Sequence, residues 1–136
     1  GEVHDENAAS MGGVSGHAGL FATTSDLCAL GNLYLRGDSD LIPPQLRTLS
    51  TTELVVSKGY RRGLGWVLAG PTAPFFDNNF DRRSFGHTGF TGTSLICDPT
   101  RGVSVALFTN SVYHGRDRKK LNELRSAVNY VVTSLW

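Results

Sequence analysis

The clearest pattern along the chain is an alternation of apolar with small polar residues between positions 84 and 110. Residues 93–97 and 103–108 alternate with a period of two, and residues 84–88 form a third short run ahead of them. Such alternation is typical of β-strands. In Asp98-Pro99-Thr100-Arg101-Gly102, proline presets φ and glycine accommodates a positive φ, so the last two strands are predicted to form a hairpin. Because neither face of the last strand is charged, other segments must cover both sides.

Three other segments have the features of helices. Thr23 and Asp26 resemble a capping box, and Gly37 stands where a C-terminal cap belongs. The apolar stripe of this first helix is Leu27, Leu30, Leu33 and Tyr34. Pro43-Pro44 suits the start of a second, short helix. The clearest helix is predicted over residues 116–136, with one apolar face. That face consists of Leu121, Leu124, Val128, Val131 and Leu135.

The remaining segments are less regular. Residues 60–68 are predicted to form one more strand, and residues 71–83 a surface loop. Residues 1–23 are polar and rich in glycine, which favours a loop packed closely against other backbone. His4, Asp5, Glu6 and His17 lie in this stretch. Their spacing matches no metal site, so we expect a solvated loop and no bound metal.

Composition narrows the class of protein. The chain has 136 residues, of which 40% are hydrophobic and 18% charged, with a net charge of +1. This describes one globular domain and gives no electrostatic reason to expect nucleic acid or a membrane surface. No apolar run approaches the roughly 20 residues that span a bilayer, and no signal peptide is recognisable. Cys28 and Cys97 are predicted to be buried free thiols, and the basic residues at 116–120 a solvated surface.

Several spaced motifs stand in a recognisable order. They are Val3-His4-Asp5-Glu6-Asn7-Ala8, residues 12–21, Asp26-Leu27, residues 62–66, residues 85–93 and Asp98-Pro99. Together they resemble the beta-lactamase-related serine hydrolases, which include class C beta-lactamases, penicillin-binding DD-peptidases and related esterases. The resemblance covers nearly the whole chain.

The mechanism of this family needs a Ser-x-x-Lys nucleophile pair, a Tyr-x-Asn or Ser-x-Asn triad and a Lys/His-Thr-Gly strand. Only the third is found: no serine has lysine three residues on, and no tyrosine has asparagine two residues on. In the family both other motifs lie upstream. The chain also begins at Gly1 without a methionine. We therefore expect the C-terminal part of a larger enzyme, with one wall of the active site and no nucleophile.

By this resemblance, residues 87–90 carry the functional groups. His87 and Thr88 would contact the carboxylate or polar tail of the substrate, and Gly89 would allow a close backbone approach. The backbone amide of Phe90 would be one of two donors to the oxyanion. The strand would be an edge strand that pairs with an extended acyl substrate. Histidine in place of lysine predicts a pH-sensitive contact, because imidazole titrates near neutrality.

The resemblance also implies an α+β fold, the C-terminal part of the beta-lactamase/DD-peptidase-like fold with its N-terminal catalytic portion absent. Its antiparallel sheet would be flanked by helices. Residues 1–60 would belong to the helical region with the glycine-rich loop, and residues 61–136 would supply sheet strands and the C-terminal helix. Strands from the N-terminal portion would complete the sheet.

Two functions remain open at this point. The first is part of a serine hydrolase that cleaves a beta-lactam, a D-Ala peptide or an ester through an acyl-enzyme, without a cofactor. The alternative is a non-catalytic ligand- or partner-binding domain on the same scaffold. Expected partners are an acyl substrate and either the N-terminal portion of the same protein or a second copy. The resemblance suggests a bacterial protein, periplasmic, extracellular or cytoplasmic.

Overall fold

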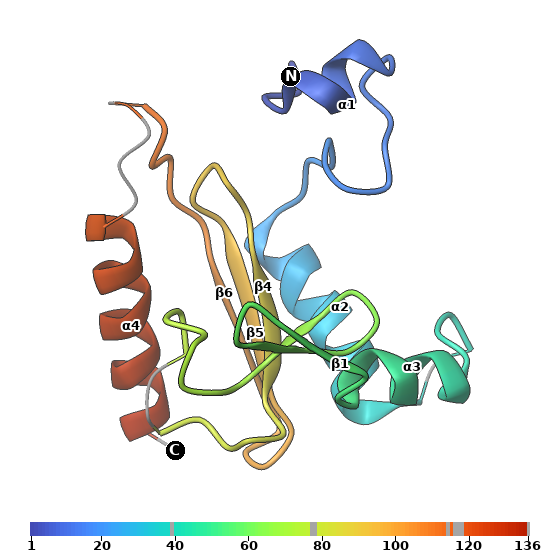
Figure 1. The fold of residues 1–136 in the computed structure, drawn as a ribbon, viewed down its shortest axis with the longest axis vertical. Coiled ribbons are helices and arrows are strands. Elements are labelled where there is room, and N and C mark those ends of the chain that lie inside the picture. The colour runs from blue at the N-terminus through green and yellow to red at the C-terminus, as the bar shows by residue number, and fades with distance from the viewer. Residues whose placement is uncertain (39, 77–78, 114, 116–118, 136) are drawn as a thin grey trace.

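The computed structural model describes residues 1–38, 40–76, 79–113, 115 and 119–135. Six strands form one antiparallel sheet in the order β1 to β6, so each strand pairs with the next along the chain (Figure 1). The fold is α+β, as predicted from the family resemblance. The elements are α1 (Glu6–Ser10), α2 (Thr24–Arg36), α3 (Pro44–Thr51), β1 (Val55–Ser57), β2 (Tyr60–Arg62), β3 (Val67–Leu68), β4 (Phe85–Thr88), β5 (Ser94–Asp98), β6 (Val103–Leu107) and α4 (Lys119–Ser134).

The three strands predicted from alternation are β4, β5 and β6, and the predicted hairpin joins the last two. Its turn is closed by the carboxylate of Asp98, whose Oδ1 accepts the backbone N–H groups of Thr100 at 2.9 Å and Arg101 at 3.3 Å. Gly102 has a φ of 68°, which a side chain would disfavour. The residues of the turn therefore set the register of the hairpin.

The segment predicted as one strand over residues 60–68 is two strands, which is a correction. β2 and β3 are joined by a turn in which the N–H of Gly63 donates to the carbonyl of Trp66 at 3.1 Å. Gly65 in this turn has a φ of 90°. β1 precedes them and was not predicted, because three residues are too few to show alternation.

Helix α2 covers one face of β5 and β6 (Figure 1). The predicted capping box is present, with Thr23 and Asp26 each accepting from the other's backbone N–H, and Gly37 is the left-handed C-cap. Gly31 is buried against the sheet, where a Cβ atom would lie 2.8 Å from Cβ of Ser104 and 3.0 Å from Sγ of Cys97. Both cysteines are free thiols, and burial raises the pKa of Cys97 to about 12.

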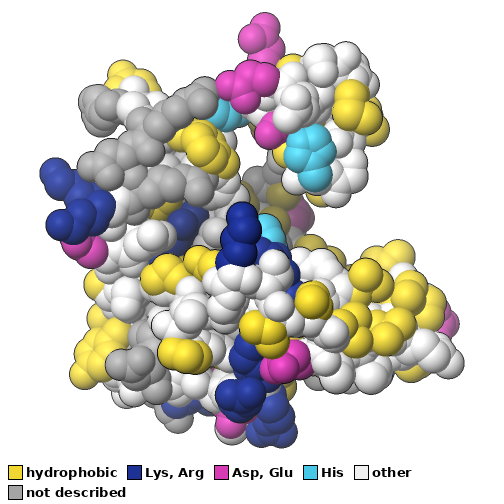
Figure 2. Space-filling model, viewed as in Figure 1, with side chains coloured by type: hydrophobic (Ala, Val, Ile, Leu, Met, Phe, Trp, Pro, Cys, Tyr) yellow, Lys and Arg dark blue, Asp and Glu magenta, His cyan; other side chains and the backbone are white. Residues whose placement is uncertain are grey.

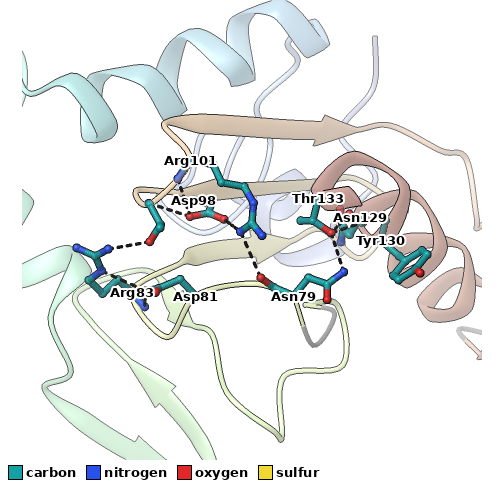
Figure 3. Close-up of polar contacts among 9 residues, drawn as sticks. Asn79, Asp81, Arg83, Asp98, Arg101, Asn129, Tyr130 and Thr133 are labelled. Carbon is teal, nitrogen blue, oxygen red and sulfur yellow. Dashed lines mark hydrogen bonds and ion pairs between the residues drawn. The ribbon is translucent and has the colours of Figure 1, made fainter. Parts of the chain in front are cut away.

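The opposite face is covered by α4 and by the loop after β3 (Figure 1). Predicting that loop as surface was wrong for its first half, because Ala73, Phe75 and Phe76 pack with Ile96 in a core cluster. Residues 77 and 78 lie outside the described residues. Figure 3 shows the polar contacts that hold the loop: Arg101 Nη1 donates to the carbonyl of Asn79 at 3.2 Å and to Asp98 Oδ2 at 2.6 Å.

The predicted apolar face of α4 coincides with the buried face only in part, since Leu121 is buried and Val128 is half-buried. Leu124, Val131 and Leu135 are exposed. The buried residues recur every four positions instead, and they are Leu121, Arg125, Asn129 and Thr133. Arg125 and Asn129 donate to backbone carbonyls of neighbouring loops, as when Asn129 donates to the carbonyl of Phe75 at 2.6 Å, whereas the hydroxyl of Thr133 donates to the carbonyl of Asn129 within the helix at 3.0 Å. The predicted first residues of the helix, 116–118, and with them two of the four basic residues of the cluster, fall outside the described residues.

Candidate active site

Residues 87–90 lie where β4 ends and the chain turns back into β5. The turn is closed by two backbone hydrogen bonds, from the N–H of Gly89 to the carbonyl of Thr93 at 2.8 Å and from the N–H of Gly92 to the carbonyl of Gly89 at 3.2 Å. A side chain at Gly89 would collide with the hydroxyl of Thr93, and Gly92 has a φ of 116°. These glycines are therefore required by the turn itself, and Phe90 lies at its exposed tip, with 43% of its surface exposed.

β4 lies between β3 and β5, so it is not the outer strand that the sequence predicted. Within the described sheet, however, its register with β3 covers Phe85 and Gly86 alone. His87 and Thr88 extend past the end of β3 while remaining paired with Leu95 and Ser94 of β5. At His87 and Thr88, one side of β4 is therefore not paired with β3, although the strand is internal to the sheet as a whole.

The side chain of His87 is exposed, and its Nδ1 lies 3.1 Å from the carbonyl oxygen of Thr88. Desolvation by the surrounding protein lowers the pKa of His87 below its ordinary value of 6.5, the nearby Arg62 cation lowers it further, and the contact with the Thr88 carbonyl acts in the opposite direction. A histidine with a lowered pKa is mainly neutral at pH 7. It therefore differs from a lysine at the same position, which would carry a constant charge.

A cavity of about 420 Å³ lies beside the tip of the turn. It is lined by the N-terminal segment, residues 2–6 and 17–21, and by two residues of the turn, and Figure 2 shows a hollow between this part of the chain and the rest of the molecule. His4 and Phe90 meet at this cavity with their rings stacked, 5.9 Å between centroids and 27° between planes. The other lining residues are Glu2, Val3, Asp5, Glu6, His17, Ala18, Gly19, Leu20, Phe21 and Thr91.

The glycine-rich loop is tied to the N-terminal segment through a chain of three side chains. Ser15 Oγ lies 2.6 Å from His17 Nδ1, and His17 Nε2 lies 3.0 Å from Asp5 Oδ1. Asp5 also caps α1, a short helix that the sequence did not predict, by accepting the N–H of Ala8 at 2.8 Å. The Ala8 N–H and His17 lower the pKa of Asp5. This carboxylate joins the loop to α1, and among the described residues no group of metal-ligating side chains converges.

A buried arginine on α4 contacts the turn between β4 and β5. Nη2 of Arg125, on α4, lies 3.1 Å from the carbonyl oxygen of Gly89 and 2.8 Å from that of Thr93. Neither Arg125 nor His4 was identified from the sequence as part of a site. The sequence contains one indication for Arg125. It lies four positions after Leu121, which is the spacing at which buried residues recur along α4.

Comparison with known proteins identifies relatives of the chain. Residues 1–130 match the family described as Beta-lactamase. A protein of Escherichia coli K12 named "Putative D-alanyl-D-alanine carboxypeptidase" is 38% identical over 117 residues, which cover 81% of this chain and 26% of that protein. An N-acetylmuramyl-L-alanine amidase of Bacillus subtilis is also 38% identical over 117 residues, with the same coverage of 81% and 26%. The match thus spans about a quarter of the length of these relatives.

Solved structures resemble the fold. A beta-lactamase from Mycobacterium bovis superimposes with a TM-score of 0.70 at 23% identity, covering 87% of this chain and 46% of the other. A penicillin-binding protein homologue from Caulobacter crescentus gives a TM-score of 0.55 at 24% identity, covering 76% and 30%. In the part of the chain that the structure describes, no helix is long and apolar enough to cross a membrane.

Proposed function

The chain belongs to the beta-lactamase family of serine hydrolases, and from this premise we propose that residues 87–90 form one wall of an acyl-transfer site. The observation that carries the proposal is the tight turn after β4, which presents Phe90 at the edge of a 420 Å³ cavity. A fixed backbone amide beside a cavity is the arrangement that stabilises a developing oxyanion.

Each residue has a chemical task in this proposal. The backbone N–H of Phe90 donates to the oxyanion of the tetrahedral intermediate, and Gly89 keeps the turn tight enough to present it. The free edge of β4 at His87 and Thr88 aligns an extended substrate by strand addition. The hydroxyl of Thr88 and the imidazole of His87 bind the polar or carboxylate end of that substrate.

The nucleophile is proposed to lie upstream, in sequence that precedes this chain in the complete protein. No serine here has lysine three residues later, and the match covers 26% of the relatives' length. In this assignment residues 1–60 belong to the helical region of the complete fold, except that β1 and Tyr60 are already part of the sheet, and residues 61–136 belong to its sheet region. The exposed apolar side chains on α3 and β1 would then contact the upstream portion. They include Leu46, Leu49, Val55 and Val56.

The names of the relatives suggest the substrate class. One relative is named "Putative D-alanyl-D-alanine carboxypeptidase" and another "N-acetylmuramyl-L-alanine amidase", and both names refer to an amide of alanine. We therefore propose a cell-wall peptide as substrate, attacked by serine to give an acyl-enzyme and then hydrolysed. The carboxylate that ends such a peptide suits the position of His87 and Thr88.

The proposal is tested by acyl-enzyme formation in the complete protein. Full-length protein is incubated with benzylpenicillin and, separately, with a D-alanyl-D-alanine peptide, and its intact mass and the release of D-alanine are followed. We expect one covalent adduct on a serine upstream of Gly1, and none when the 136-residue chain is treated alone. An adduct on Ser15, which lies beside His17, would place the nucleophile within this chain and refute the assignment. Reversible peptide binding without an adduct or product would favour the non-catalytic alternative.

A further inference from the structure

We propose that Arg125 is a positioning residue for this site, which fixes and polarises the peptide group between Gly89 and Phe90. The inference rests on the proposed function, because that peptide supplies the Phe90 amide assigned to the oxyanion. Arg125 is 3% exposed and is carried by α4, far from residues 87–90 in sequence.

The geometry follows from the planarity of the peptide bond. The carbonyl of Gly89 and the N–H of Phe90 belong to one peptide group, which is trans. In a planar trans peptide the two groups point in opposite directions. Because Nη2 of Arg125 holds the Gly89 oxygen at 3.1 Å from the side of α4, the Phe90 N–H is directed away from α4.

The same nitrogen also fixes the two ends of the turn relative to each other. Nη2 donates to the carbonyl oxygen of Thr93 at 2.8 Å as well as to that of Gly89. The carbonyl oxygen of Thr93 also accepts the backbone N–H of Gly89 at 2.8 Å. One planar, charged group therefore bridges the start and the end of the turn. Lysine carries a compact ammonium on a flexible stem instead of a planar guanidinium, so it would hold this bridge less rigidly and reproduce it only in part.

The positive charge of Arg125 has a second effect on this peptide group, in addition to orienting it. A cation that hydrogen-bonds to a carbonyl oxygen draws electron density from the amide, and this strengthens the N–H of the same peptide as a donor. The effect is large in a buried position, because water does not screen the guanidinium there. Arg125 thus acts on the oxyanion through the peptide, without touching the substrate.

Kinetics of the full-length protein test the proposal. The rate constant of acylation and the preceding binding constant are measured with a fluorescent penicillin for wild type, Arg125→Met and Arg125→Lys. The matched control is Asn129→Leu, which removes another buried polar side chain of α4, one that donates to the carbonyl of Phe75 and lies outside the turn. We expect Arg125→Met to slow acylation by about 10- to 100-fold with little change in binding, since small misplacements at a reacting centre have effects of this size. Arg125→Lys should recover part of the rate.

A second measurement reads the peptide directly. Gly89-Phe90 is the one Gly-Phe pair among these 136 residues, so labelling glycine with ¹³C at the carbonyl and phenylalanine with ¹⁵N selects its signal, which the loss of that signal in Phe90→Leu identifies in the full-length protein. We expect Arg125→Met to move the Gly89 carbonyl shift and to speed hydrogen exchange at the Phe90 amide, and Asn129→Leu to leave both unchanged.

The outcomes separate the two proposals. The role of Arg125 would be overturned if acylation slowed no more in Arg125→Met than in Asn129→Leu, or if the Gly89 signal stayed unchanged. The proposed acyl-transfer site would be unaffected by either result. The proposed function would be refuted if the wild-type protein failed to react while its Gly89 signal still responded to Arg125→Met. The contact between Arg125 and Gly89 would then have no role in catalysis.

Discussion

The imidazole of His4 stacks on the phenyl ring of Phe90, with 5.9 Å between their centroids. This contact joins the N-terminal segment to the turn after β4 and forms part of the wall of the cavity. It links two segments that are far apart in the sequence through a pair of rings, and its removal should loosen both of them.

We predict that His4→Ala weakens this packing by about 0.5–1.5 kcal/mol, the usual contribution of an aromatic pair. Hydrogen exchange of the amides at residues 3–6 and 90–91 should become faster, and His4→Phe, which keeps an aromatic ring, should restore the protection. Equal exchange in His4→Ala and wild type would show that the stack contributes nothing to the order of the cavity wall.

The charge state of His87 predicts a pH dependence of substrate binding. Because the pKa of His87 is lowered from 6.5, the imidazole becomes cationic only as the pH falls below that value. Attraction for a substrate carboxylate should therefore increase from pH 7 to pH 5, which is seen as a lower KM for a peptide with a free carboxylate. His87→Ala should remove this increase, and His87→Lys should give tight binding across the whole range. Matching profiles for wild type and His87→Ala would exclude His87 as the titrating contact.

The close approach of α2 to the sheet predicts a sensitive position at Gly31. A Cβ there would already lie 2.8 Å from Cβ of Ser104. Gly31→Val should lower the free energy of unfolding by about 1–3 kcal/mol through overpacking. Ala29→Val places the same side chain on the exposed side of this helix and should cost well under 1 kcal/mol. Urea denaturation of the two variants measures the difference, and equal losses would mean that α2 does not rest on the sheet through Gly31.

Much of the fold could be predicted from local signals. Thr23, Asp26 and Gly37 bound α2, and the turn after Asp98 sets the β5–β6 hairpin, because each feature is encoded by neighbouring residues. The covering of both faces of the hairpin was predicted as well. The packing of α2 on one of these faces was not predicted, since Gly31 shows no apolar signal although it permits the close contact with Ser104 and Cys97.

The candidate site was predicted less completely, for a physical reason. Periodicity identifies an apolar face, but α4 packs through Arg125 and Asn129, whose hydrogen-bond acceptors are backbone carbonyls of Gly89, Thr93 and Phe75. These acceptors are distant in sequence and become neighbours only in the folded chain. Short elements such as β1 and α1 were missed because they contain too few residues to show a period.

The exposed apolar side chains of α3, β1 and the glycine-rich loop predict that the 136-residue chain associates when isolated. Leu20 is 96% exposed and Val56 57% exposed. Covering a few hundred Å² of such surface is worth several kcal/mol, at about 25 cal/mol per Å². Sedimentation at micromolar concentration should show oligomers that dissociate when the upstream portion of the protein is added. A monomer that unfolds cooperatively would contradict this expectation.

The central claim, that the Phe90 amide belongs to an acyl-transfer site, is tested most directly by removing that N–H. Phe90→Pro in the full-length protein deletes the donor, and Phe90→Leu changes the side chain while keeping it. The rate constant of acylation by benzylpenicillin is measured for both, with circular dichroism as a check of folding. We predict a loss of about 100- to 1,000-fold for Phe90→Pro, the effect of losing one oxyanion donor, and a small change for Phe90→Leu. A folded Phe90→Pro protein that is acylated as fast as Phe90→Leu would contradict the claim.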